Sequence, residues 1–406
     1  SLLIDNDVLR HAAIRVPTGN VLSPRTVTVS YDKPQPAVPF EESQLLDPEL
    51  FAGFGARICE TVRPFSRNPL IEQLWPLAQE AARRTNRVNH CLAEARHRME
   101  HAWGLETLEL PLGEVCQQTA FRWFMSHILA QAPRFRAEHN DVLNEYRRVN
   151  RVRSKTHPVP ELAQQEDWVE VPFWIWTSDN PIRRPLFVRP VGSHSELSDL
   201  RGLTLADVPL NPAGDEASVA YFAEREQQGI KIRPRALMTT MFARLFLSDL
   251  FLHGIGGAKY DQLTDELIQR IFRCPAPNFL VVTASAHLPI PRDPVCPSDL
   301  RDLRQLAREF RFHPERHLAT SSAAKPLIDE KQKWIRDDTS SPRQRHQAIN
   351  RLNNTLTGLL REKQTQNAER TAQVVASLAR ERVLGSREYS FCLFSQATLQ
   401  PLLLDI

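Results

Sequence analysis

One stretch of the sequence, from Arg233 to Val282, constrains the fold more than any other. It runs RPRALMTTMFARLFLSDLFLHGIGGAKYDQLTDELIQRIFRCPAPNFLVV. An apolar run leads into a glycine-containing turn, then into a segment with helical periodicity, and then into a short apolar run. Apolar runs of strand length that alternate with helical segments predict parallel strands joined by helices. We therefore expect an α/β fold with a parallel sheet.

The sequence before this stretch predicts a mixture of helices and strands. Leu2–Ile4 has the composition of a buried strand that ends in acidic residues. Apolar positions at helical spacing predict one long amphipathic helix over 74–103 and two further helices over 119–130 and 135–149. The runs VPFWIW and PLFVRP, separated by a turn-rich link, predict a β-hairpin. Trp174 and Trp176 alternate with their neighbours, so we expect one face of this hairpin to pack on helices and the other to line a cleft.

The C-terminal third has a different pattern. Apolar residues recur at heptad spacing on both sides of a bend at Thr339–Pro342, and Gly385 ends the pattern. This predicts an antiparallel coiled-coil arm, followed by the segment YSFCLF, which is strand-like or docks back on the core. Such an arm commonly carries a contact between subunits, so a homodimer is expected, with a solitary structural hairpin as the alternative.

Composition excludes several classes of protein. The 51 Lys and Arg residues nearly balance the 48 Asp and Glu residues, and the net charge of +3 argues against a dedicated nucleic-acid binder. No apolar run reaches the roughly 18–20 residues of a membrane span. Six cysteines stand singly without a C-x-x-C pair, which favours free thiols in a reducing cytoplasm. The chain opens SLLIDND without Met, so we expect that residues were removed or that the numbering begins inside a larger protein.

The order of these segments resembles the bacillithiol-forming cysteine-adding enzyme family (BshC). The likeness is carried by the stretch from Arg233 to Val282, in which nine positions match the family pattern: Arg233, Pro234, Leu237, Asp249, Gly256, Gly257, Tyr260, Pro275 and Pro277. The resemblance implies a Rossmann-like core with connecting insertions and a coiled-coil arm that pairs subunits. The chain lacks the glycine-loop segment with which that family begins, and its acidic segment differs, so we expect a divergent relative.

The resemblance and the segment patterns together predict five parts. We expect the start of the Rossmann-like core at 1–70, a helical and β-hairpin insertion at 71–200, the second half of the core at 201–295, the coiled-coil arm at 296–385 and a docking segment at 386–406.

The glycine turn is the first candidate site. Its spacing matches neither G-x-G-x-x-G nor the P-loop, so a standard phosphate loop is excluded. Two interpretations stay open for Gly256 and Gly257: a tight turn or close helix–sheet packing that requires glycine, or amides that contact a substrate. Lys259 is suited to meeting a carboxylate or phosphate, and Tyr260 either donates a hydrogen bond or packs.

Three further groups of residues complete the predicted site. His253 could transfer protons near neutral pH or be structural. Asp5 and Asp7 lie two residues apart at a strand end, and they either bind an amine, a hydroxylated ring or Mg²⁺ from one face or form an ordinary turn. Arg233 and Arg235 could clamp a carboxylate.

These residues predict a cytoplasmic ligase of the cysteine-adding type that acts on an acidic, sugar-bearing or related small molecule. His253, Asp5 and Asp7 are the catalytic candidates, and the substrate-binding candidates are Arg233, Arg235, Gly256, Gly257, Lys259 and Tyr260. No metal site is predicted, and an adenine nucleotide is the one cofactor left open. The alternative is a non-catalytic binding or scaffold protein that retains the fold and the arm.

Overall fold

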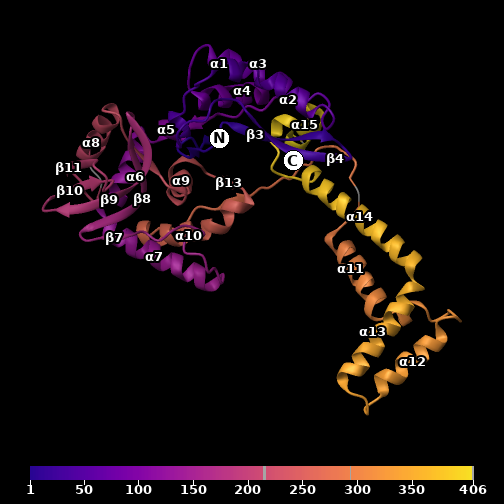
Figure 1. Ribbon diagram of the computed structural model, residues 1–406. Helices are drawn as coiled ribbons and strands as arrows, with labels where there is room; N and C mark the ends of the chain where they lie inside the picture. The colour runs from indigo at the N-terminus through magenta and orange to yellow at the C-terminus, as the bar shows by residue number, and fades with distance from the viewer. Residues whose placement is uncertain (214–215, 293, 405–406) are drawn as a thin grey trace. The chain divides into compact units, whose positions relative to one another are not determined.

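The computed structural model describes residues 1–213, 216–292 and 294–404 (Figure 1). The chain forms two compact units, each built from separate segments. The first unit comprises Ser1–Ile14, Val29–Arg57 and Ile71–Ser285, and the second comprises Arg15–Thr28, Ile58–Leu70 and Ala286–Ile406. The fold is mixed α/β, as the sequence predicts.

A six-stranded sheet dominates the first unit. Its strand order is β11-β10-β9-β8-β12, with β7 paired to β8, and every pairing is antiparallel. The strands are β7 (Gln164–Gln165), β8 (Trp168–Thr177), β9 (Asn180–Val191), β10 (His194–Ser198), β11 (Thr204–Val208) and β12 (Ile230–Pro234).

The central hairpin of this sheet is the one predicted from VPFWIW and PLFVRP. Thr177 of β8 pairs with Asn180 of β9 across a tight turn. Aromatic and β-branched residues favour strands, and in β8 both faces are largely buried. Phe173 and Ile175 are fully buried in the core, whereas Trp174 on the opposite face is only partly buried.

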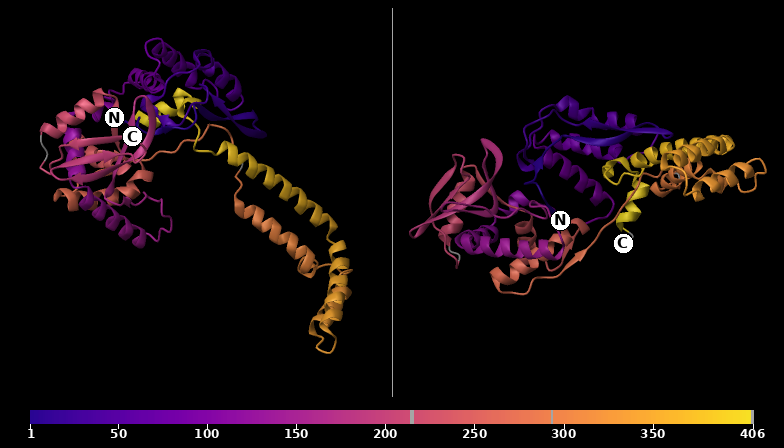
Figure 2. Two further views of the ribbon diagram at one scale, coloured as in Figure 1. Left: turned by 60° about the vertical axis from the view of Figure 1, so that its left-hand side comes forward. Right: turned by 60° about the horizontal axis from the view of Figure 1, so that its bottom comes forward.

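The first unit also contains helices. They are α1 (Pro48–Ala52), α2 (Phe54–Val62, which runs into the second unit), α3 (Ile71–Ala82), α4 (Val88–Ala102), α5 (Leu112–Val115), α6 (Thr119–Ala130), α7 (Ala132–Val149), α8 (Glu216–Gln227), α9 (Ala236–Phe242) and α10 (Ile255–Phe272). A π-helical turn at Ala243–Leu247 follows α9. Helices α7 and α9 pack on β8, and α10 packs on both helices (Figures 1 and 2). The main core lies between these layers.

The long helix predicted over 74–103 is two helices. Helix α3 ends at Ala82 and α4 begins at Val88. The intervening RRTNR is polar, and its backbone bonds to another segment: Leu45 N–H donates to the Asn86 carbonyl at 2.7 Å, and Val88 N–H donates to the Ser43 carbonyl at 3.2 Å. Because these groups find partners outside a helix, the helix breaks although the apolar periodicity runs on.

The parallel Rossmann-like core does not appear among the described residues. Parallel pairing occurs in two short pairs, β1 (Leu2–Leu3) with β6 (Leu110–Pro111) and β13 (Phe251–His253) with β14 (Phe279–Val281). The strands of the large sheet follow one another mostly through short turns, which impose antiparallel neighbours. The expected strand at NFLVV is present as β14, and in the part of the chain that the structure describes it pairs with β13 only. A further short antiparallel pair joins β2 (Val8–Leu9) to β5 (Val38–Pro39).

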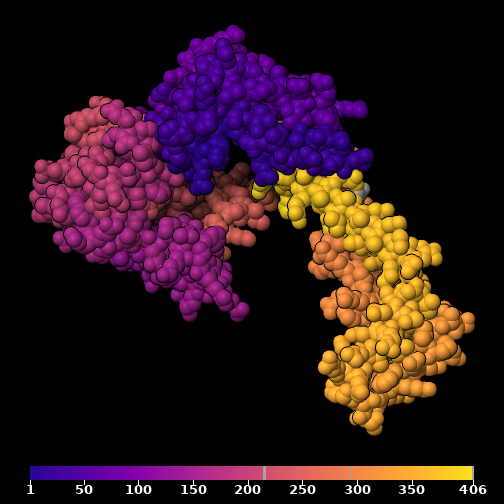
Figure 3. Space-filling model, in the orientation of Figure 1, coloured from indigo at the N-terminus to yellow at the C-terminus, as the bar shows by residue number. Residues whose placement is uncertain are grey.

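The second unit contains the predicted helical arm. It consists of α11 (Pro297–Phe312), α12 (Lys325–Arg336), α13 (Pro342–Gly358) and α14 (Arg361–Leu384). Helix α11 packs on α14, and α12 packs on α13 (Figure 2), so the arm is two successive helix pairs instead of one continuous coiled coil. The arm is long and narrow (Figure 3). A small cluster that includes Phe310, Leu356 and Leu360 is buried where the two pairs meet.

The rest of the second unit is built from short elements. These include the hairpin β3 (Ala13–Asn20) with β4 (Ser23–Ser30), the end of α2, 3-10 turns at Pro314–His317 and Phe391–Leu393, and α15 (Gln396–Leu404). The segment YSFCLF is therefore a turn and not a strand. It docks on the chain before α3, where Leu70 N–H donates to the Phe394 carbonyl at 2.8 Å. Residues 405–406 of the predicted docking segment lie outside the described residues.

Candidate functional site

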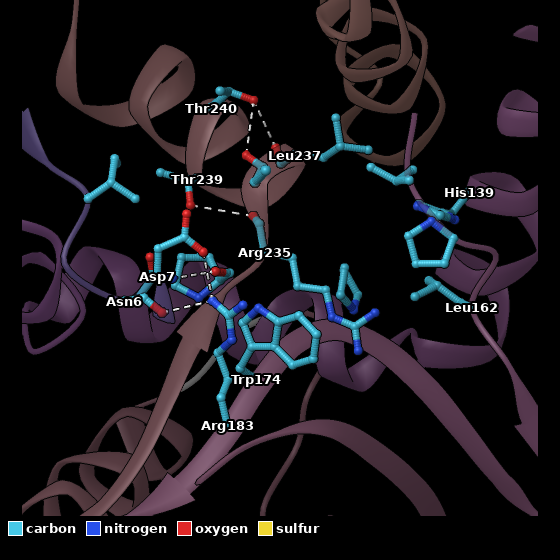
Figure 4. Close-up of a pocket in the computed structure, with 16 residues that line it drawn as sticks. Asn6, Asp7, His139, Leu162, Trp174, Arg183, Arg235, Leu237, Thr239 and Thr240 are labelled. Carbon is cyan, nitrogen blue, oxygen red and sulfur yellow. Dashed lines mark hydrogen bonds and ion pairs between the residues drawn. The ribbon is translucent and has the colours of Figure 1, made fainter. Parts of the chain in front are cut away.

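A pocket of about 360 Å³ opens in the first unit beside β8, β9 and the junction of β12 with α9 (Figure 4). Pockets of this size hold small organic molecules. Most of its lining is apolar: Ile4, Val159, Pro160, Leu162, Pro172, Trp174, Pro234, Ala236 and Leu237. Its polar lining is Asn6, Asp7, His139, Arg183, Arg235, Thr239 and Thr240. Asp7 and Arg235 are the two predicted site residues that meet here.

The guanidinium groups of Arg183 and Arg235 both stack on the indole ring of Trp174. The guanidinium carbon of Arg235 lies 4.1 Å from the centre of the indole ring, and that of Arg183 lies 4.6 Å from it. In Figure 4 the indole lies between the two side chains. Stacking on an aromatic face holds a guanidinium in place while its N–H groups stay free to donate in the ring plane.

Arg235 is the more buried cation and is incompletely paired. Its Nη2 donates to Glu170 Oε1 at 2.6 Å, and the other Glu170 oxygen accepts the Ala163 N–H at 2.8 Å. The Nε of Arg235 is buried and has no hydrogen-bond partner among the described residues. Burial lowers the pKa of Arg235 from its ordinary value and Glu170 opposes the shift, so the side chain stays a cation at neutral pH. A buried N–H without a partner is costly unless a ligand accepts it.

Arg183 is held by the N-terminal segment. Its Nη1 donates to the Asn6 carbonyl at 2.9 Å and to Asp7 Oδ1 at 3.0 Å. The side chain of Asp7 is 78% exposed, whereas that of Arg183 is 19% exposed. An exposed carboxylate is a weak partner, because water screens it. Asp7 can therefore give way to a ligand anion at small cost.

The remaining polar groups differ in what they can offer. The hydroxyl of Thr240 donates to the Leu237 carbonyl at 3.1 Å, within its own helix. The hydroxyl of Thr239 donates to the Arg235 carbonyl, one helical turn earlier, at 3.4 Å. His139 is almost completely buried, and burial lowers its pKa to about 4. It is a neutral imidazole at physiological pH.

The segment that contributes Val159, Pro160 and Leu162 forms one wall of the pocket. It has little secondary structure and is fastened by Arg147 of α7, whose guanidinium donates to the Val159 carbonyl at 2.9 Å and the Lys155 carbonyl at 2.6 Å. Tyr260, a predicted substrate-binding residue, also holds this segment, because its hydroxyl lies 3.0 Å from His157 Nε2. Tyr260 thus supports the wall and does not line the pocket.

Asp5 and Arg233 lie in a buried network beside the pocket. Arg233 is enclosed between two carboxylates, with Nε 3.0 Å from Glu41 Oε1 and Nη2 2.8 Å from Glu226 Oε1. Asp5 accepts the Gly113 N–H at 3.0 Å, and burial raises its pKa. Burial likewise raises the pKa of Glu41. Because of these contacts, the side chains of Arg233 and Asp5, two predicted site residues, are bonded within the protein and do not face a substrate.

The two predicted pairs are therefore separated. Strand β1 ends at Leu3, so Asp5 and Asp7 share no strand face: Asp5 is buried, and Asp7 is exposed at the pocket. Arg233 ends up inside the network, whereas Arg235 follows the last residue of β12 and precedes α9, which turns its side chain onto Trp174.

The glycine turn forms a separate feature. His253 ends β13, and Gly254 precedes the first turn of α10, which contains Gly256, Gly257 and the exposed Lys259. A Cβ atom built on Gly257 would lie 1.8 Å from His253 Cε1, whereas one on Gly256 would meet nothing within 4 Å. Of the two interpretations of this turn, the structural one accounts for Gly257, because the His253 ring packs closely against it. None of these residues lines the pocket around Trp174.

Three of the central pocket residues were not singled out as site residues: Trp174, Arg183 and His139. The alternation in VPFWIW did indicate a cleft-lining face, and Trp174 lines the pocket as expected. Trp176 is buried instead, with its Nε1 3.1 Å from Glu42 Oε1. Nothing in the local sequence marks His139, because it is a single histidine in α7 with no recognisable motif around it.

No protein-family model matches the chain, and no curated protein matches it. Within the described residues, no helix is long and apolar enough to cross a membrane. Among the same residues, no cluster of three or more His, Cys, Asp or Glu side chains is arranged to hold a metal ion.

Proposed function

We propose that this chain binds a small organic anion with an apolar body in the pocket around Trp174. The observation that carries the proposal is the buried Nε of Arg235, which has no hydrogen-bond partner within residues 1–213, 216–292 and 294–404, in a pocket whose walls are mostly apolar. A carboxylate on the ligand would accept that N–H, and charge assistance makes such a bond stronger than a neutral one.

The charges around the pocket support an anion over a cation. Glu170 uses both of its oxygens within the protein, and Asp7 points largely to solvent. Both guanidinium groups, by contrast, keep N–H groups beyond those bonded to Glu170, Asn6 and Asp7. The apolar lining favours a hydrocarbon or aromatic body over a sugar, because few groups are present to bond a ring of hydroxyls.

Two narrower forms of this proposal follow from the sequence. In the first, the chain is a cysteine-adding ligase, cytoplasmic and paired through its helical arm, and the bound acid is its substrate. In the second, it is a binding or scaffold protein without turnover. Incubation of the bound acid with cysteine, with and without ATP, followed by mass spectrometry for a cysteine adduct, distinguishes the two, and sedimentation measures the oligomeric state.

Calorimetric titration of the complete chain with benzoate and with benzyl alcohol tests the binding proposal. We expect benzoate to bind and the neutral alcohol to bind at least about tenfold more weakly, as a charged hydrogen bond contributes about 1.5–3 kcal/mol. Arg235→Gln should reduce benzoate affinity by a similar factor.

A matched control is present on β9, the strand that also carries Arg183. Arg189 of β9 stacks on Trp168 at 4.6 Å and pairs with Glu196, but it lies outside this pocket. Arg189→Gln should leave benzoate affinity unchanged. Equal loss in both variants, or no binding of benzoate by the parent chain, would refute the proposal.

A further inference from the structure

The hydrogen bonds around His139 determine which of its ring nitrogens carries the proton. Asn140 is fixed by the backbone of Leu162: its Nδ2 donates to the Leu162 carbonyl at 2.9 Å, and its Oδ1 accepts the Leu162 N–H at 2.9 Å. These two hydrogen bonds to the backbone of one residue fix which atom of the Asn140 amide is the oxygen and which is the nitrogen. Oδ1 is therefore an acceptor, and it lies 3.1 Å from His139 Nδ1.

It follows that His139 Nδ1 carries the hydrogen. A neutral imidazole has one N–H and one bare nitrogen, so Nε2 holds a lone pair. Burial lowers the pKa of His139 to about 4, and the positive charge of Arg235 acts in the same direction, so the ring stays neutral. Nε2 has no hydrogen-bond partner in the part of the chain that the structure describes.

His139 thus adds a buried, neutral acceptor to a pocket in which the carboxylate of Asp7 already accepts from Arg183. The two guanidinium groups are donors only, and the Thr240 hydroxyl already donates within its helix. Figure 4 shows His139 and Leu162 on the same side of the pocket as the guanidinium of Arg235. A ligand that contacts both residues meets a cationic donor and a neutral acceptor.

We infer that the ligand is a hydroxylated monocarboxylate with a compact apolar or aromatic body, whose carboxylate lies on Arg235 and whose hydroxyl donates to His139 Nε2. This inference rests on the anion-binding function proposed above and specifies the ligand class. An ammonium group would also donate, but Arg183 and Arg235 both line the pocket and would repel it. A hydroxyl supplies the donor without a charge.

Titration of the complete chain with benzoate, the three monohydroxybenzoates and the corresponding methoxybenzoates tests the inference. The methoxy compounds keep the oxygen but cannot donate. We expect at least one hydroxybenzoate to bind about five- to tenfold more tightly than benzoate, and its methoxy counterpart to show no such gain. In His139→Phe, which keeps a ring against Phe135, the ratio of hydroxybenzoate to benzoate affinity should fall to about one.

A second measurement tests the tautomer without any ligand. Nitrogen-15 shifts of the His139 ring at pH 7 should show a protonated Nδ1 and a bare Nε2, and a protonated Nε2 would overturn the inference. If benzoate binds and no hydroxybenzoate gains affinity, the ligand class is wrong while the anion site stands. If none of the acids binds, both proposals fail.

Discussion

The imidazole of His253 fills the space that a side chain at Gly257 would need. A Cβ at that position would lie 1.8 Å from Cε1 and 2.5 Å from Nδ1 of the ring. The ring is held on its other sides by Phe251, with ring centres 5.2 Å apart, and by Phe279, at 6.3 Å. The glycine therefore lets the strand β13 and the first turn of α10 approach each other closely.

Substitution at this glycine should destabilise the chain. We expect Gly257→Ala to lower the free energy of unfolding by about 1–3 kcal/mol, because the added methyl group forces the His253 ring out of its place. Gly256→Ala is the matched control, since its Cβ would enter open space and alanine is favoured in helices. Urea denaturation of both variants measures the difference, and an equal effect at the two positions would contradict the packing account.

Disrupting the buried network around Arg233 should lower the free energy of unfolding more than Gly257→Ala does. Arg233→Met removes the cation that lies between Glu41 and Glu226 and leaves two carboxylates without it, so we expect a loss of about 3–5 kcal/mol. Arg148→Met, at an exposed pair with Glu145, should change stability by less than about 0.5 kcal/mol. Thermal and urea unfolding of the two variants would show this contrast, and similar values would mean that the network contributes little.

Because burial lowers the pKa of His139, we expect the stability of the chain to depend on pH. Its pKa is about 4 in the folded chain and near ~6.5 in an unfolded one, so the unfolded state binds a proton first as the pH falls. Stability should therefore decline between about pH 6.5 and pH 4, with a share of about 2 kcal/mol from this residue at pH 4.5. His139→Gln should remove that share. A parallel decline in the variant and the parent chain, measured by urea unfolding at each pH, would assign the effect to other groups.

Thiol reactivity should follow burial. Cys296 is exposed before α11, whereas Cys91, Cys116 and Cys392 are buried. Burial raises the pKa of the Cys392 thiol to about 11 and raises that of Cys116 well above its ordinary value, which leaves almost no thiolate at neutral pH. Iodoacetamide should label Cys296 within minutes and the three buried thiols only in denaturant, as read by peptide mass spectrometry. Rapid native labelling of Cys116 would contradict the buried network around it.

Local patterns predicted individual elements well and their assembly poorly. Helix α6 has the predicted bounds, and α7 begins three residues before the predicted helix, because apolar spacing reports which face of a helix is buried. The sheet was expected to be parallel because apolar strands such as Phe279–Val281 follow helices. Pairing depends on contacts far apart in the sequence, such as β12 with β8, and periodicity carries no information about them.

The site illustrates the same limit. Asp7 and Arg235 line the pocket. Two residues away from each, Asp5 is a buried acceptor of the Gly113 N–H and Arg233 is a buried ion-pair partner of Glu41. A shift of two positions along a strand keeps the same face, but both pairs lie where a strand ends and the chain changes direction. The sequence also could not reveal that Glu41 and Glu226 pair with Arg233, because Glu41 is far from it along the chain and neither pairing follows from a local pattern.

The fastening of the pocket wall by Arg147 has an evolutionary consequence. The wall segment that holds Val159, Pro160 and Leu162 is anchored mainly through its backbone carbonyls, which every amino acid provides. Insertions or substitutions in that loop can reshape the apolar half of the pocket without disturbing Arg235 or Trp174 on the sheet side. Chains with this architecture can therefore diverge in the size of the acid they accept while the means of recognising its charge is inherited intact.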